Sequence, residues 1–261
     1  MSSALHTARS GLDAQDMRMR VISNNLANVN TTGFKRDRAE FQSLMYQNYR
    51  QAGANSEQAT QYATGLNIGT GVRVVGTERI NTQGSMQATD NPTDMAINGD
   101  GYFQVLKPDG TITYTRDGSF TVSSENLLVT NDGYPLQPDI TIPEGAQSLT
   151  IGKDGTVSIV NPGDATPSQI GQIQIANFLN PAGLQPLGDN LFAETAASGA
   201  PIVGTPGVDG LGEINQNMLE TSNVNMVEEM VNMIETQRAY EVNSKVISTV
   251  DGMMQYVTQN L

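Results

Sequence analysis

The chain has 261 residues, enough to bury a sizeable core in one or two domains. It contains no cysteine, which excludes disulfides and thiolate zinc sites, and no apolar run approaches 18 residues, so no membrane-spanning helix is predicted. The formal net charge of −13 divides into +3 over residues 1–50, −12 over residues 51–216 and −4 over residues 217–261, and this acidic majority argues against nucleic-acid binding.

The N-terminal residues predict one long helix that ends at Gly33. Apolar side chains recur at alternating spacings of three and four, which is the narrow stripe of a helix that pairs with another helix. The segment carries charges throughout and lacks an apolar core, so it does not predict a cleaved secretory signal. The stripe consists of Leu5, Ala8, Leu12, Gln15, Met19, Ile22, Leu26 and Val29.

Three asparagines, Asn24, Asn25 and Asn28, lie near the end of this helix and face different directions around it. Amides can hydrogen-bond to flanking backbones on several sides without the desolvation cost of a charge. A packed array of subunits needs bonding of this kind. The simpler alternative is that the amides only fray and end the helix, and the residues alone leave both interpretations open.

The middle of the chain divides into a connector and a β-rich domain. Residues 34–71 predict an extended connector, in which residues 47–70 are polar, nearly patternless and too long for an inert loop. From residue 72 the apolar period changes to two, as in VRVVGTERI, MAINGDGYFQVL and TVSIV, which predicts strands. The turn sequences PDG, NDG and KDG separate them, so residues 72–221 predict a β-rich domain.

Residues 222–261 predict a second long helix, with Asn225 as its cap and Glu228 three residues later to complete a capping box. No other helical surface is predicted to pack its apolar stripe except the N-terminal helix. The predicted fold is therefore α+β, with a mainly-β central domain flanked by two terminal helices that pair as a coiled coil. The second stripe consists of Met230, Met233, Gln237, Tyr240, Ser244, Ile247, Val250, Met254, Val257 and Leu261.

No catalytic, metal or cofactor site is predicted. The only histidine, His6, lies near the start of the first helix, which makes a catalytic triad implausible. The glycines of INGDGYF and GLNIGTGV lack a phosphate-binding fingerprint. The aspartates have neither calcium-loop spacing nor a predicted pairing, so we interpret them as turn residues.

Three stretches resemble bacterial flagellar rod and hook proteins. SGLDAQDMRMRVISNNLANVNTTGFKRDRAEF resembles their N-terminal signature, ETSNVNMVEEMVNMIETQRAYEVNSKVIST their C-terminal signature, and AINGDGYFQV with YTRDGSF their β-domain motif. Within the family, the insertion YQNYRQAGANSEQATQYATGLNIGTGVRV and the modest length are most similar to distal-rod members.

The resemblance implies a structural subunit and not an enzyme. It implies export through the flagellar type III apparatus without a cleaved signal, and residence in the basal body across the periplasm, although composition alone is typical of a cytoplasmic protein. The subunits would polymerise helically into a hollow, rigid driveshaft that transmits motor torque. The terminal helices would line its channel, and the β-rich domain would lie outside. The implied partners are further copies of the chain, proximal rod and hook proteins, the surrounding outer rings and the export apparatus.

The stripes and the resemblance together predict the residues of the assembly interface. Alternatives that stay open are a proximal rod or hook subunit and, in other classes, a secreted β-rich adhesin or a sugar-processing enzyme. The predicted interface residues are Leu5, Leu12, Met19, Ile22, Asn24, Asn25, Leu26, Asn28, Val29, Gly33, Phe34, Lys35, Asn223, Val224, Glu229, Met230, Met233, Gln237, Arg238, Tyr240, Asn243, Ile247 and Met254.

Overall fold

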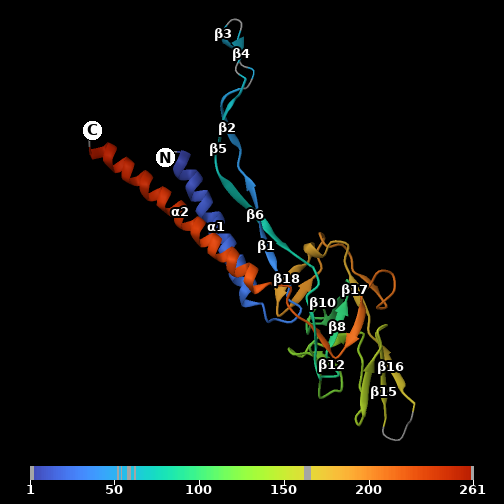
Figure 1. Ribbon diagram of the computed structural model, residues 1–261. Helices are drawn as coiled ribbons and strands as arrows, with labels where there is room; N and C mark the ends of the chain where they lie inside the picture. The colour runs from blue at the N-terminus through green and yellow to red at the C-terminus, as the bar shows by residue number, and fades with distance from the viewer. Residues whose placement is uncertain are drawn as a thin grey trace. The chain divides into compact units, whose positions relative to one another are not determined.

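A computed structural model of the chain describes residues 3–51, 53, 55–57, 60–61, 63–161 and 166–259 (Figure 1). The fold divides into two compact units. The first unit draws on Met1–Leu26, Asp37–Glu78 and Met226–Leu261, and the second on Ala27–Arg36 and Arg79–Asn225. No helix in the described ranges is both long and apolar enough to cross a membrane. The predicted domain boundaries, at residues 33, 71 and 221, stay a prediction.

Two long helices dominate the first unit, α1 (Ser3–Ala27) and α2 (Met226–Gln259). They run side by side in opposite directions, and the space beside Gly11 of α1 is filled by the Asn243 side chain of α2 (Figure 1). Two glutamates in the first turn of α2 favour the positive end of its dipole. The predicted α+β class is confirmed, with terminal helices flanking a mainly-β region.

A long two-stranded ribbon completes the first unit. β1 (Asp37–Ser43) pairs with β6 (Val72–Arg79), β2 (Tyr46–Arg50) with β5 (Leu66–Gly69), and β3 (Asn55–Glu57) with β4 (Thr60–Gln61). The sequence showed no strand pattern over residues 47–70. The reason is that every residue of β2 and β5 is exposed, so neither face of this ribbon required alternating apolar side chains.

The second unit is built on a sheet whose strand order is β18-β19-β10-β9-β17-β20, with β13 also pairing with β9. Its neighbouring strands are antiparallel throughout. A 3₁₀ turn, η1 (Pro181–Gly183), precedes β18. The strands are β9 (Tyr102–Leu106), β10 (Ile112–Thr115), β13 (Leu136–Gln137), β17 (Ile175–Asn177), β18 (Gln185–Gly188), β19 (Leu191–Ala193) and β20 (Ile202–Gly204).

Shorter pairings surround this sheet in the second unit. The strands are β7 (Met86–Ala88) with β22 (Met218–Glu220), β8 (Met95–Asn98) with β21 (Glu213–Gln216), β11 (Phe120–Val122) with β12 (Leu128–Thr130), and β14 (Ser148–Ile151), β15 (Thr156–Val160) and β16 (Ser168–Gln172) in one sheet. The glycines of the predicted PDG, NDG and KDG turns have φ of 81°, 86° and 79°, which confirms these turns.

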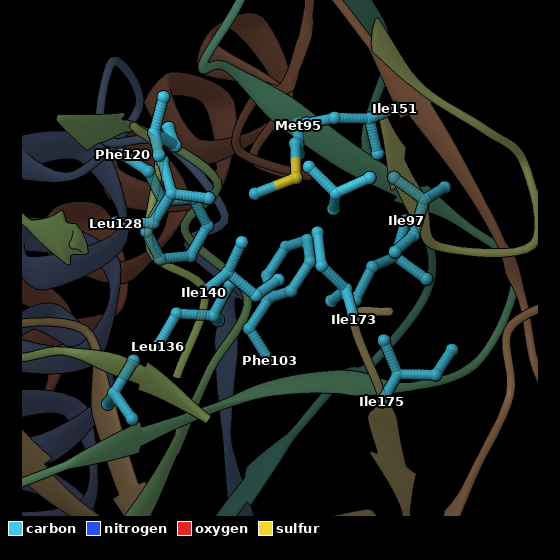
Figure 2. Packing of buried hydrophobic residues seen from close by; sticks show 14 of the residues in the cluster. Met95, Ile97, Phe103, Phe120, Leu128, Leu136, Ile140, Ile151, Ile173 and Ile175 are labelled. Carbon is cyan, nitrogen blue, oxygen red and sulfur yellow. The ribbon is translucent and has the colours of Figure 1, made fainter. Parts of the chain in front are cut away.

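The core of the second unit lies on both faces of β9. Successive strand residues point to opposite faces, so Phe103 enters the larger cluster and Tyr102 the smaller one. Phe103 is fully buried and meets the Phe120 ring edge-on at a centroid distance of 5.2 Å (Figure 2). On the opposite face, Tyr102 packs edge-on against Phe178 at 6.0 Å. The second unit therefore has the apolar burial expected of an independently stable domain.

Candidate assembly interface

The chain crosses between the two units four times, between residues 26 and 27, 36 and 37, 78 and 79, and 225 and 226. Within the second unit, three segments adjoin these crossings: residues 27–36, residues 79–85 and residues 217–225. Seven of the predicted interface residues lie on the first and third of these segments, and the others lie on the two helices: the seven are Asn28, Val29, Gly33, Phe34, Lys35, Asn223 and Val224. Their contacts within the second unit decide which of them remain available to other subunits.

A buried ionic cluster joins the three segments. Glu220, at the end of β22, accepts hydrogen bonds from Lys35 Nζ at 2.6 Å and Gly84 N at 2.8 Å through one oxygen, and from Arg116 Nε at 2.7 Å through the other. The three charged side chains are 1%, 3% and 6% exposed for Glu220, Lys35 and Arg116. Lys35 Nζ also donates to Thr82 O at 2.9 Å. Breaking such a pair by removing one partner costs about 3–5 kcal/mol because a buried charge loses its counter-charge.

The electrostatics of this cluster favour an ionised carboxylate. Burial alone would raise the pKa of Glu220, but Arg116, Lys35 and the hydrogen bonds from Lys35 and Gly84 outweigh it and hold the pKa below its ordinary value. Burial is the largest influence on the pKa of Lys35 and lowers it, although Glu220 opposes that shift. Arg116 is held further by the carbonyls of Gly99 and Gly101. Every charge in the cluster therefore has a counter-charge or a hydrogen-bond partner.

Asn223 ties the same three segments through a neutral side chain. Its Oδ1 accepts from Arg36 N at 2.7 Å, and its Nδ2 donates to Ile80 O at 2.8 Å and Thr82 O at 3.0 Å. An aspartate could not donate the last two bonds, and an alanine could make none of them. We name Lys35, Arg116, Glu220 and Asn223 the anchor cluster.

Gly33 is required by its backbone conformation and by its surroundings. Its φ is +66°, and a Cβ there would lie 2.7 Å from the backbone carbon of Arg116. Its N–H donates to Glu220 O at 2.8 Å, so the chain passes close against β22 at this point. Beside it, Thr32 Oγ1 donates to Asp117 Oδ1 at 2.8 Å. The prediction that the first helix ends at Gly33 is wrong, because α1 ends at Ala27 and residues 28–33 form turns. Gly33 is instead the point where the N-terminal signature packs against its own β domain.

The asparagines of the N-terminal signature have separate roles within the chain. Asn25 is buried and bonds the backbone of Asp37 twice, accepting from its N–H and donating to its carbonyl, both at 2.9 Å. This pair fixes the start of β1 against α1. Asn28 accepts from Thr31 Oγ1 at 3.1 Å in the turn that follows α1, whereas Asn24 is exposed. The structure thus gives Asn25 a third role, beyond the array and fraying interpretations.

The predicted stripe of α1 faces inward within the first unit. Its seven members on the helix, from Leu5 to Leu26, are buried or half-buried, and Ala8 and Ile22 are buried, whereas the eighth, Val29, lies beyond the end of α1 and in the second unit. The buried or half-buried positions described on α2 recur at helical spacing: Glu229, Asn232, Met233, Thr236, Ala239, Asn243, Ile247 and Val250. The Val257 side chain and Leu261, also in the predicted stripe, lie outside the described residues. Thr236 was not predicted, because a threonine has no apolar stripe signal; its hydroxyl donates to Asn232 O at 2.7 Å.

Other predicted residues of α2 are exposed in the single subunit. Met230, Gln237, Arg238, Tyr240 and Met254 are exposed, whereas Val224, just before α2, is buried in the second unit. Further apolar residues share this exposure: Met226, Val227, Val231, Ile234, Val242, Val246, Met253 and Tyr256. Single exposed apolar side chains are ordinary, so the frequency of such residues along this one helix is the notable feature.

Models of known protein families match three parts of the chain, near the N-terminus, in the β domain and near the C-terminus. "Flagella basal body rod protein" matches residues 5–35, "Flagellar hook protein FlgE/F/G D1 domain" matches residues 96–159, and "Flagellar basal body rod FlgEFG protein C-terminal" matches residues 215–260. The chain belongs to the flagellar basal-body rod protein family. As a member, it is a structural subunit of the flagellar rod, located in the basal body, and it assembles with other rod and hook components.

Relatives that match over nearly the whole chain are basal-body rod proteins named FlgG. The chain is 54% identical over 259 residues to FlgG of Buchnera aphidicola from Acyrthosiphon pisum, covering 99% of this chain and all of the relative. It is 50% identical to FlgG of Borreliella burgdorferi, covering 97% of each chain. It is 40% identical to FlgG of Bacillus subtilis, covering 98% of this chain and 97% of the relative.

Proposed function

We propose that this chain is the subunit of the distal rod, and that its copies polymerise helically into a rigid, hollow driveshaft that carries motor torque to the hook. The observation that carries this proposal is the number of large apolar side chains that α2 leaves exposed in the single subunit, in a chain similar over nearly its whole length to FlgG proteins. The role is structural and not enzymatic. Its partners would be further copies of the chain, proximal rod and hook proteins, the outer rings and the export apparatus.

The two units suit different places in such a tube. The helices of the first unit would line the export channel, where adaptable methionines such as Met230, Met253 and Met254 pack against neighbouring copies. The β-rich second unit would form the outer layer. Met230, Gln237, Arg238 and Tyr240 are the predicted contact residues that this arrangement uses most directly, because each is exposed in the isolated subunit.

The ribbon of the first unit supports a further part of the proposal, that it wedges between neighbouring subunits and fixes their tilt. Met45, Tyr46 and Tyr49 are 87%, 61% and 64% exposed, and Leu66 and Ile68 lie exposed on the partner strand. An isolated two-stranded ribbon is marginally stable in water, so contact with neighbours would stabilise it. Deleting residues 47–70 should give a curved or flexible structure, whereas an unchanged straight rod would contradict this role.

The test of the proposed function is deletion of the gene in its source bacterium, followed by electron microscopy of the envelope. We expect an incomplete rod without hook or filament. The full chain should restore it, and a chain without residues 1–33 should not. A rod of full length that lacks only the hook would indicate a hook subunit, and loss of the whole rod a proximal one. Normally flagellated cells would refute the proposal and favour the adhesin alternative.

A further inference from the structure

The anchor cluster connects parts of the chain that are far apart in sequence. Lys35 and Glu220 are separated by 185 residues, and Arg116 and Glu220 by 104 residues. Both helices and the ribbon enter or leave the second unit through residues that this cluster binds. The cluster therefore holds together the segments of the second unit that adjoin these elements in the chain.

The hydrogen bonds of the cluster form a closed network across the three segments. Glu220 contacts the first segment through Lys35 and the second through Gly84. Asn223 contacts the first through Arg36 N and the second through Ile80 O. Backbone bonds run in parallel: Gly33 N donates to Glu220 O, Ile80 N to Arg36 O, and Asn223 N to Phe34 O. No segment can move out without leaving a buried polar group of the other two unbonded.

All of these contacts lie inside the second unit, which has its own apolar core. Nothing in the network requires the helix pair of the first unit. We expect both helices, in contrast, to be largely unfolded in the free subunit, because within the chain two long helices have little besides each other to pack against. The two parts of the chain should therefore order at different stages.

We propose that the bonds of the anchor cluster are already formed in the free subunit. They hold residues 32–36, 79–85 and 217–224 as one body with the β domain. The chain segments that follow α1, flank the ribbon and precede α2 are then ordered before the helices pair. On the proposed rod function, on which this consequence rests, a subunit joins the polymer with these segments already ordered. The anchor cluster also resists separation of the three segments when the β domain is twisted.

The test is hydrogen exchange of the purified, monomeric full-length chain, read by mass spectrometry. In the unmodified chain, peptides covering the three segments should be protected as strongly as β9, while peptides within α1 and α2 exchange rapidly. Glu220→Gln leaves two buried cations without a counter-charge, so exchange in all three segments should accelerate together by about tenfold or more. The matched control is Glu213→Gln in β21, where an exposed carboxylate pairs with Lys153 at 3.1 Å, and it should change no segment.

A milder variant keeps the test decisive if Glu220→Gln unfolds the whole unit. Asn223→Ala removes the bonds to Arg36, Ile80 and Thr82 without creating a buried charge. It should accelerate exchange in the same three segments and leave β9 protected. Acceleration confined to one segment, or three segments that exchange as fast as the helices in the unmodified chain, would overturn the proposal. Because the monomer alone is measured, either result is independent of whether the chain forms the distal rod.

Discussion

Replacing Gly33 by alanine should destabilise the second unit far more than the same change at another positive-φ glycine. At φ +66° an L-residue costs about 1–2 kcal/mol, since its Cβ approaches the following carbonyl. At Gly33 the new Cβ would also lie 2.7 Å from Arg116 C and 2.9 Å from Asp117 N. Both are backbone atoms, so no side-chain rotation relieves the clash.

The clash adds two further costs. Pushing the chain away from β10 and β22 costs about 1–3 kcal/mol, as overpacking usually does. It also weakens the bond from Gly33 N to Glu220 O, worth about 1 kcal/mol. The sum is about 3–6 kcal/mol, and for a unit of this size each kcal/mol lowers the melting temperature by about 2–4 °C. We expect a fall of about 10 °C or more for Gly33→Ala.

Gly133 provides the matched control. It has φ +86°, and a Cβ there would meet nothing within 4 Å. Gly133→Ala therefore isolates the conformational cost, about 1–2 kcal/mol. Both variants should be measured by calorimetry and by urea unfolding of the full-length monomer, with tyrosine near-ultraviolet circular dichroism reporting on the β domain. Equal destabilisation by the two substitutions would refute the close approach of the N-terminal signature to Arg116.

Four further predictions concern both units. The pKa of Glu220 in the folded chain lies below its ordinary value of 4.5, so its contribution to stability is complete above pH 4.5 and is lost as the pH falls through the folded pKa. Measuring the free energy of unfolding against pH in acid should show this loss, and Glu220→Gln should make the pH dependence shallower. Phe103→Ala should cost about 3–5 kcal/mol in urea unfolding, with Ile112→Ala at an exposed position of β10 as a nearly neutral control. In the assembled rod, Asn25→Ala should speed exchange of the Asp37 amide about five- to tenfold while amides of β9 stay unchanged, because a bond of about 1–1.5 kcal/mol is lost. In the assembled rod, Gly11→Leu should prevent the close approach of Asn243 and reduce helical circular dichroism, whereas Gly11→Ala, whose Cβ meets only the flexible end of that side chain at 3.2 Å, should be tolerated.

The helices and the β class could be predicted because their signals are local. A stripe repeated at spacings of three and four can be recognised from neighbouring residues alone, and its seven positions from Leu5 to Leu26 are buried or half-buried on α1. Val29 was wrongly included, because the helix ends at Ala27. The Asp-Gly turns are equally local, because Gly110, Gly133 and Gly155 adopt the positive φ that the turn type demands. For α2 the predicted stripe was only partly right, because it included Met230, which is exposed, and omitted Thr236, which is buried. Thr236 can be buried because its hydroxyl donates a hydrogen bond within the helix.

The ribbon and the anchor cluster were beyond prediction for different reasons. All residues of β2 and β5 are exposed, so neither strand needs the alternation of apolar and polar residues by which a strand is recognised in a sequence. The anchor cluster joins side chains as much as 185 residues apart, and the spacing of Lys35 and Glu220 in the sequence does not predict their contact. Arg116 was visible only as part of the motif YTRDGSF, where its guanidinium could equally have been solvated.

The two terminal signatures therefore combine residues with separate physical roles. Gly33, Lys35 and Asn223 have their polar groups bonded within the second unit, so substituting them alters the subunit itself. Met230 and Tyr240 are exposed, so substituting them leaves the isolated subunit intact and acts only where another copy or partner covers them. If each signature were treated as a single interface, substitutions that alter the subunit would not be distinguished from those that act only on contacts with other subunits. The anchoring residues lie after α1 and before α2, and the exposed residues of α2 are the ones that the proposed function uses for assembly.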